Sequence, residues 1–141
     1  MVAKSNRLRS ALLASSSVLV LGGGALPAAA QSLPSQGVVT SGAASISQSG
    51  ASMTVTQGSA RAIINWDIFS IGQHNAVTFV QPNASSAILN RVTGNTTSTI
   101  AGQLNANGQV YLVNPNGIAI TKSGAVQVGG SFVATTLAIR N

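Results

Sequence analysis

Short runs in which apolar and small or polar residues alternate constrain the fold of this chain most strongly. Examples are residues 53–56, 118–121 and 126–128. In an extended strand, such alternation places the apolar side chains on one face and the small or polar ones on the other. From Gly37 onward, extended runs recur about every eight to twelve residues, separated by Gly, Asn, Ser or Pro. The pattern predicts an all-β domain, and periodicity alone leaves a sandwich, a barrel and a solenoid open.

The composition argues against chemistry that needs acids or thiols. The 141-residue chain has no cysteine, which excludes disulfides and zinc-thiolate sites. Asp67 is its single acidic residue, whereas glycosidic chemistry normally uses a pair of carboxylates. His74 is its single histidine, and one His and one Asp cannot fill a metal site. We therefore predict a protein that is not an enzyme and that has no cofactor, metal or catalytic residues.

Residues 1–30 have the three-part layout of a secretory signal peptide. A basic start precedes an apolar stretch over residues 11–21, and three alanines lie directly before Gln31. Signal peptidase needs small residues there, so we expect cleavage between Ala30 and Gln31. The alternative is an uncleaved N-terminal anchor, although the apolar stretch is short for a permanent membrane span. The mature domain is therefore expected over residues 31–141, exported by the Sec route.

The net charge does not favour nucleic-acid binding. The formal charge is +6, and removing the three leader bases Lys4, Arg7 and Arg9 leaves +3. These remaining charges are spread along the sequence without a basic patch interleaved with aromatic residues, which is the pattern expected of a nucleic-acid interface. We expect no nucleic acid among the partners.

The tetrapeptide Asn114-Pro115-Asn116-Gly117 lies between two apolar runs and predicts a sharp β-turn. Proline presets φ near −65° at the second turn position, and asparagine side chains bond nearby backbone. We expect positive φ at Asn116 and Gly117, so a β-branched residue at either position would be strained. Taken alone, the tetrapeptide is equally consistent with an ordinary loop between two strands.

Five further blocks occur in a fixed order around this turn. They are residues 64–72 (INWDIFSIG), 77–82 (VTFVQP), 87–94 (AILNRVTG), 100–104 (IAGQL) and 133–139 (VATTLAI). Together with the turn, they resemble the N-terminal secretion domain of filamentous haemagglutinin-type exoproteins, the family of two-partner secretion. The resemblance extends from about Val38 to the last residue. A second asparagine-rich turn, Asn-Pro-Asn-Leu, which larger members carry, is not found in this sequence.

This resemblance implies a right-handed parallel β-helix, a short β-solenoid of four or five coils with about 20 to 25 residues each. It implies a domain exported to the cell surface or medium of a Gram-negative bacterium as part of an adhesin. Its transporter would be a partner outer-membrane barrel whose periplasmic POTRA domains bind extended segments. The same resemblance names a secretion motif made of Asn90, Arg91, Val92, Thr93, Gly94, Asn114, Pro115, Asn116 and Gly117. We expect the domain to be incomplete at its C-terminal end, and host-cell glycans or receptors to be a further class of partner.

Other interpretations remain at this point. Low charge and strands rich in Asn, Gln, Ser and Gly are also typical of a self-assembling, curli-like surface fibre. Trp66 and Phe69 are expected to pack in the core or in an end cap, and the alternative for Trp66 is an exposed platform for sugar stacking. The numerous Asn and Gln residues are expected either to form amide ladders between coils or to be scattered polar turn residues.

Overall fold

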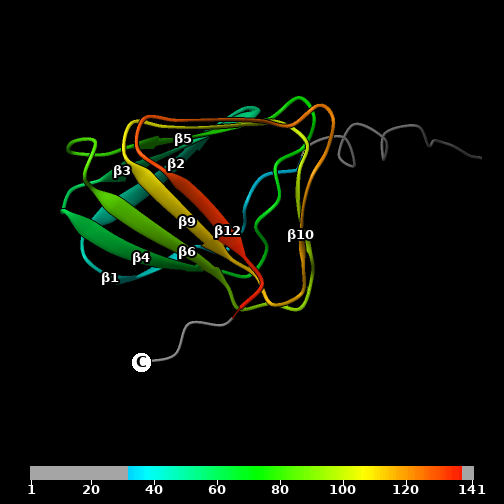
Figure 1. Cartoon of the computed structure of the whole chain (residues 1–141), viewed down its shortest axis with the longest axis horizontal. Coiled ribbons are helices and arrows are strands. Elements are labelled where there is room, and N and C mark those ends of the chain that lie inside the picture. The colour runs from blue at the N-terminus through cyan, green and yellow to red at the C-terminus, as the bar shows by residue number, and fades with distance from the viewer. Residues whose placement is uncertain (1–31, 138–141) are drawn as a thin grey trace, which may run out of the picture. The chain divides into compact units, whose positions relative to one another are not determined.

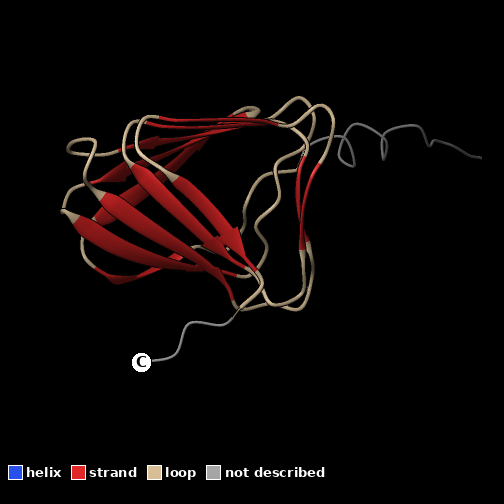
Figure 2. Cartoon of the chain, in the orientation of Figure 1, coloured by secondary structure: helices blue, strands red, loops and turns tan. Residues whose placement is uncertain are grey.

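The computed structural model describes residues 32–137, and it is all-β over this range, with no helix (Figure 2). The predicted signal peptide and the cleavage position between Ala30 and Gln31 lie outside the described residues. Within residues 32–137, nothing has the helical length and apolar character needed to cross a membrane.

The described residues form strands of three to six residues separated by short turns. They are β1 (Val38–Ser41), β2 (Ala44–Ser49), β3 (Ser52–Gln57), β4 (Arg61–Trp66), β5 (Ala76–Val80), β6 (Ala87–Val92), β7 (Ser98–Ile100), β8 (Gln103–Ala106), β9 (Gln109–Val113), β10 (Ile118–Ile120), β11 (Ala125–Val128) and β12 (Phe132–Thr135). Most of the strands are bounded by the Gly, Asn, Ser or Pro residues that the sequence pattern indicated.

These strands build three sheets that are the walls of a coil (Figure 1). The first sheet has the order β1-β4-β6-β9-β12, the second has β11-β8-β5-β3-β2, and the third pairs β10 with β7. The chain visits the walls in turn, and each of the two larger sheets receives one strand per rung of the coil. The first rung contributes to the third wall only through an isolated bridge between Ile71 and Ile100. The register sets the rung length: Ala76 pairs with Gln103, and Ala87 with Gln109, which corresponds to about 22 to 27 residues per rung.

From β3 to β12, all pairs between rungs are parallel. The parallel β-solenoid that the resemblance implied is therefore confirmed. The first two strands are exceptions that the sequence pattern does not predict. β1 pairs antiparallel with β4, and β2 pairs antiparallel with β3, so two reversed strands cover the first rung on two of its walls.

Inward-facing apolar side chains fill the coil, one layer per rung. Val55 and Phe79 are buried in the same column, as are Ile88 and Val110. Trp66 and Phe69 are each 1% exposed and pack edge to face with ring centroids 5.6 Å apart. Their predicted place in the core is confirmed. The alternative of a sugar-stacking platform on Trp66 is wrong, because the ring is enclosed by the coil.

Burial declines at the last rung. Along one inward column, Ile71 and Ile100 are fully buried, whereas Ile120 is 50% exposed. The sequence pattern places Ile120 on the apolar face, and its pairing with Ile100 agrees. The exposure arises because no described rung stacks over it.

Candidate functional site

The two segments of the predicted secretion motif lie side by side on adjacent rungs. β6 and β9 are parallel neighbours, with Arg91 paired to Val113. Residues 90–94 therefore comprise the end of β6 and the two residues after it, and residues 114–117 directly follow β9. Both segments turn from the first wall toward the third. We call residues 90–94 and 114–117 the motif corner.

A hydrogen-bonded β-turn closes the second segment. The Gly117 N–H donates to the Asn114 carbonyl at 3.1 Å, and the Asn116 N–H donates to Asn114 Oδ1 at 2.9 Å. Gly117 has the expected positive φ, at 121°. The expectation for Asn116 is wrong: among non-glycine residues in the described range, only Gln36 has positive φ. Asn at the first position, Pro at the second and Gly at the fourth match a type I turn, whose third residue has φ near −90°.

Asn114 is fully buried, and its bonds join neighbouring rungs. Its Nδ2 donates to the Thr96 carbonyl at 3.0 Å and to Ser98 Oγ at 2.8 Å on the preceding rung. Its backbone N–H donates to the Thr135 carbonyl at 3.0 Å on the following rung. A buried amide that is satisfied in this way stabilises the fold and is not available to a partner while the coil is formed.

One side-chain bond connects the two motif segments directly. Asn116 Nδ2 donates to the Gly94 carbonyl at 2.9 Å, across 22 positions of sequence. Gly94 itself packs against the preceding rung, where a Cβ would lie 2.6 Å from Asp67 Oδ1 and closer still to the Asp67 carbonyl oxygen. The Thr93 N–H donates to the Trp66 carbonyl at 2.8 Å. The corner is thus bonded from rung to rung.

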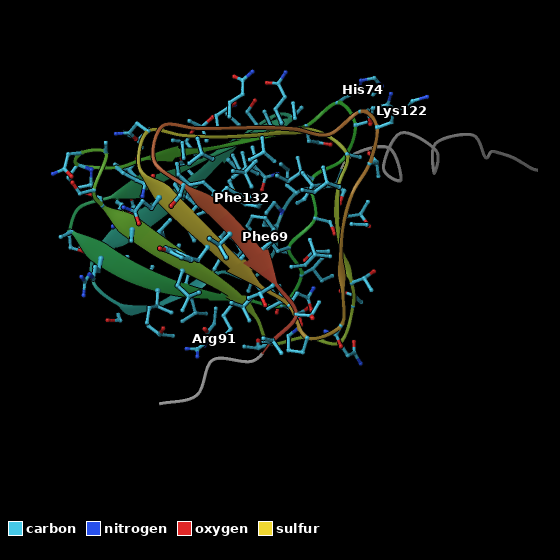
Figure 3. The ribbon with its side chains drawn as sticks, in the orientation of Figure 1. Phe69, His74, Arg91, Lys122 and Phe132 are labelled. Carbon is cyan, nitrogen blue, oxygen red and sulfur yellow. The ribbon has the colours of Figure 1, made fainter. Side chains whose placement is uncertain are left out.

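The remaining motif residues lie on β6, where successive side chains point alternately into the core and out of the coil. Asn90 points into the core with no exposed surface, accepts a bond from Trp66 Nε1 at 2.9 Å and donates to the Tyr111 carbonyl at 3.3 Å. Val92 is 4% exposed and belongs to the core. Arg91 lies on the outside of the coil (Figure 3), where its Nε donates to Asn65 Oδ1 at 3.1 Å.

Side-chain exposure separates two groups within the motif. Asn90, Val92 and Asn114 are buried, whereas Thr93, Pro115 and Asn116 are exposed. The buried group can act only through the fold or in an extended chain. The exposed group forms one small surface at the edge between two walls.

A second corner joins the two five-stranded sheets and contains an amide ladder, one of the two arrangements expected for the Asn and Gln residues, at positions that the sequence analysis did not single out. Gln81 is 5% exposed and its Nε2 lies within bonding distance of Gln57 Oε1 (3.1 Å) and of the Gln109 carbonyl (3.0 Å). Its Oε1 accepts a bond from the Gly108 N–H at 2.9 Å. We call residues 57, 81, 86, 107, 108 and 109 the glutamine corner. Gln57 ends β3, and Gln81, 24 positions further on, directly follows β5 of the same sheet, which is the signal that could have indicated the ladder.

The chemistry available at the motif corner is that of amides, hydroxyls and backbone groups. Within the described range, no three His, Cys, Asp or Glu side chains gather in a way that could hold a metal ion. What the corner can do is lock one rung onto the next.

Comparison with known proteins agrees with this architecture. Residues 30–141 match the family model of the TPS secretion domain. A heme/hemopexin-binding protein of Haemophilus influenzae is 46% identical over 112 residues, which are 79% of this chain and 12% of the relative. Another heme/hemopexin-binding protein of Haemophilus influenzae is 50% identical over 84 residues, 60% of this chain and 9% of that relative.

A solved structure shares the fold. The crystal structure of the HMW1 secretion domain from Haemophilus influenzae superposes with a TM-score of 0.70 at 40% identity and covers 77% of this chain and 28% of that chain. This chain therefore spans only a small part of the length of the relatives it matches. These similarities favour a secretion domain over a curli-like fibre, an alternative that no match supports. The chain belongs to the two-partner secretion family, and residues 30–141 are its TPS secretion domain.

Proposed function

We propose that this domain directs a longer exoprotein through an outer-membrane partner whose periplasmic POTRA domains bind it in extended form. Membership of the family supports an outer-membrane partner and a secreted product. Strand addition to a POTRA sheet edge suits a chain made of short strands, because backbone pairing supplies affinity and alternating side chains supply register. The lack of cysteine means that no disulfide can lock the chain before transit.

In this proposal the motif corner acts as a folding lock that forms outside the cell. The observation that carries it is the bond from Asn116 Nδ2 to the Gly94 carbonyl at 2.9 Å, which joins the two motif segments only when two rungs have stacked. The burial of Asn90 and Asn114 supports the same role, since neither side chain can dock a partner on the folded coil. Contacts between neighbouring rungs are sequential, so folding can follow the chain as it emerges.

The test separates export from folding. The full chain is produced with its partner transporter, and the secreted and periplasmic amounts are compared for the wild type, Asn114→Ala and Gly117→Val. Asn95→Ala is the matched control, because Asn95 is exposed in the turn that follows Gly94. We expect a several-fold loss of secreted protein for both motif variants and none for the control, since buried unsatisfied groups and strain at positive φ each cost about 1 to 3 kcal/mol.

A second measurement assigns the cause. Chains diluted from denaturant are passed over immobilised POTRA domains of the partner before they fold. The folding-lock role predicts that Asn114→Ala binds as well as the wild type, within about twofold. Loss of this binding would show that the motif is recognised directly by the transporter. Secretion of the wild-type chain without the partner would overturn the export function itself.

A further inference from the structure

The outer faces of the two five-stranded sheets differ in chemistry. On the β4-β6-β9-β12 wall, one outward column is apolar on every rung: Ile63, Leu89, Tyr111 and Val133. We call these four residues the outer stripe; the four strands that carry them lie side by side in Figure 1. The matching outward column on the other wall is polar on every rung, with Thr54, Thr78, Asn105 and Gln127. An outward column that contacted only solvent would not be expected to be apolar on every rung.

A cavity of about 370 Å³ opens beside the outer stripe. Its lining includes Arg61, Ile63, Ala87, Leu89 and Tyr111. The hollow arises because Ala87 lies in register between the longer side chains of Arg61 and Gln109. A largely apolar hollow with one charged group at its edge is the usual composition of a binding site.

The charge on this wall has one sign. Arg61 borders the cavity, and Arg91 lies on the opposite side of the outer stripe, in the column that begins with Asn65. These are the two arginines of the described range. A guanidinium group pairs best with a carboxylate or a phosphate, and it forms two parallel hydrogen bonds with either. The wall therefore presents an apolar centre between two anion-binding groups.

We propose that the outer stripe docks an extended acidic peptide segment of a partner protein, with an apolar side chain in the cavity and carboxylates on Arg61 and Arg91. The stripe crosses four stacked strands and is about 14 Å long at the usual strand spacing, which is longer than a small ligand bound in the cavity would cover. A second copy of this chain cannot supply the carboxylates, because its single acidic side chain is Asp67. The partner must bring its own acidic residues.

The experiment uses the full chain and a fluorescein-labelled octapeptide in which Asp, Leu and Asp occupy every second position with serine between them, so that all three side chains face the wall. A peptide with lysine in place of aspartate is the charge control. Fluorescence anisotropy measures binding at low salt. We expect the acidic peptide to bind, the basic one not to, and Arg61→Gln and Leu89→Ser each to weaken binding about tenfold. Val80→Ser is the matched control, since Val80 is 46% exposed on the other wall, and it should bind as the wild type does.

Several outcomes would overturn the proposal. They are equal binding of both peptides, no binding of the acidic peptide, or no effect of Arg61→Gln. Sedimentation that shows a dimer abolished by Leu89→Ser would assign the stripe to a second copy. Binding to phosphatidylglycerol vesicles without binding to the acidic peptide would assign the outer stripe to a membrane surface. Fluorescence of the buried Trp66 reports whether each variant is folded, and Arg61→Gln keeps the test valid if Leu89→Ser does not fold.

Discussion

The motif corner and the glutamine corner both join rungs with amide side chains, yet they depend on different ranges of sequence. In the motif corner, Asn114 Oδ1 bonds Asn116 two positions away, and other side-chain bonds reach residues 94, 96 and 98 on the preceding rung, 16 to 22 positions away. In the glutamine corner, Gln81 bonds residues 24 to 28 positions away on both neighbouring rungs. The first corner thus includes a turn that the local sequence indicates, in addition to bonds between rungs, whereas the main bonds of the second form only when the rungs are stacked.

Burial also differs between the two corners. The motif corner exposes Pro115 and Asn116, so its outer bonds compete with water. The glutamine corner encloses Gln57 and Gln81, which are 4% and 5% exposed. Asn114 is buried as well, but its side chain bonds two groups on the neighbouring rung, whereas that of Gln81 bonds three groups on neighbouring rungs, so the corner without a recognisable motif should contribute more to stability.

Gln81→Leu is therefore expected to have the largest effect. It leaves the Gly108 N–H and the Gln109 carbonyl without their side-chain partner, and the free energy of unfolding should fall by about 4 kcal/mol. Urea unfolding followed by Trp66 fluorescence measures this. Gln127→Leu is the control, because Gln127 is exposed, and it should change stability by less than about 0.5 kcal/mol. Equal midpoints for the two variants would contradict the ranking of the corners.

Asn114→Asp should have the next largest effect and a distinctive pH dependence. The new carboxylate would face the Thr96 carbonyl without a proton to donate, and burial would raise its pKa in the folded state. The loss, about 3 kcal/mol at pH 7, should therefore shrink as the pH falls toward the ordinary carboxyl pKa of about 4, since protonation removes the charge. Unfolding curves from pH 7 to 4 measure it. With the exposed Asn95→Asp as control, a loss that does not depend on pH would contradict the burial of Asn114.

The comparison of corners also explains which features the sequence could predict. Alternation within runs such as residues 53–56 indicated the strands, because it depends only on neighbouring residues. The solenoid was predicted from the family resemblance. Asn90 lies at an inward position between Ile88 and Val92, so a polar residue on the apolar face was a readable signal of a buried bond. Its partner, Trp66, is 24 positions away and could not be assigned without the register.

Two features could not be predicted for physical reasons. The tetrapeptide at residues 114–117 fits a type II turn with Asn at the third position and a type I turn with Gly at the fourth, and only tertiary contacts select the second. The sequence pattern likewise does not predict the reversed direction of β1 and β2, because side chains alternate in the same way in parallel and antiparallel strand pairs.

Gly94→Ala tests close packing in the motif corner, with an intermediate effect. The added Cβ would collide with the backbone and side chain of Asp67 on the preceding rung, so we expect a loss of about 2 kcal/mol. Gly58→Ala is the matched control in the glutamine corner's first rung, because a Cβ there would lie 3.5 Å from Ala43 Cβ, an ordinary contact. Thermal unfolding of the two variants compares them directly. If Gly58→Ala were the more damaging, the rungs would not approach more closely at Gly94 than at Gly58.

Asn116 should give the smallest effect and the sharpest test of the turn itself. Asn116→Ala removes the exposed bond to the Gly94 carbonyl and should cost about 1 kcal/mol or less. Because the φ of Asn116 is not positive, Asn116→Ile should cost nearly the same, whereas at positive φ a β-branched residue would add about 1 to 3 kcal/mol. Urea midpoints of the two variants provide the comparison. A markedly lower midpoint for Asn116→Ile than for Asn116→Ala would indicate that the φ of Asn116 is positive. The exposed side of the motif corner would then depend on backbone strain as well as on its amide bond.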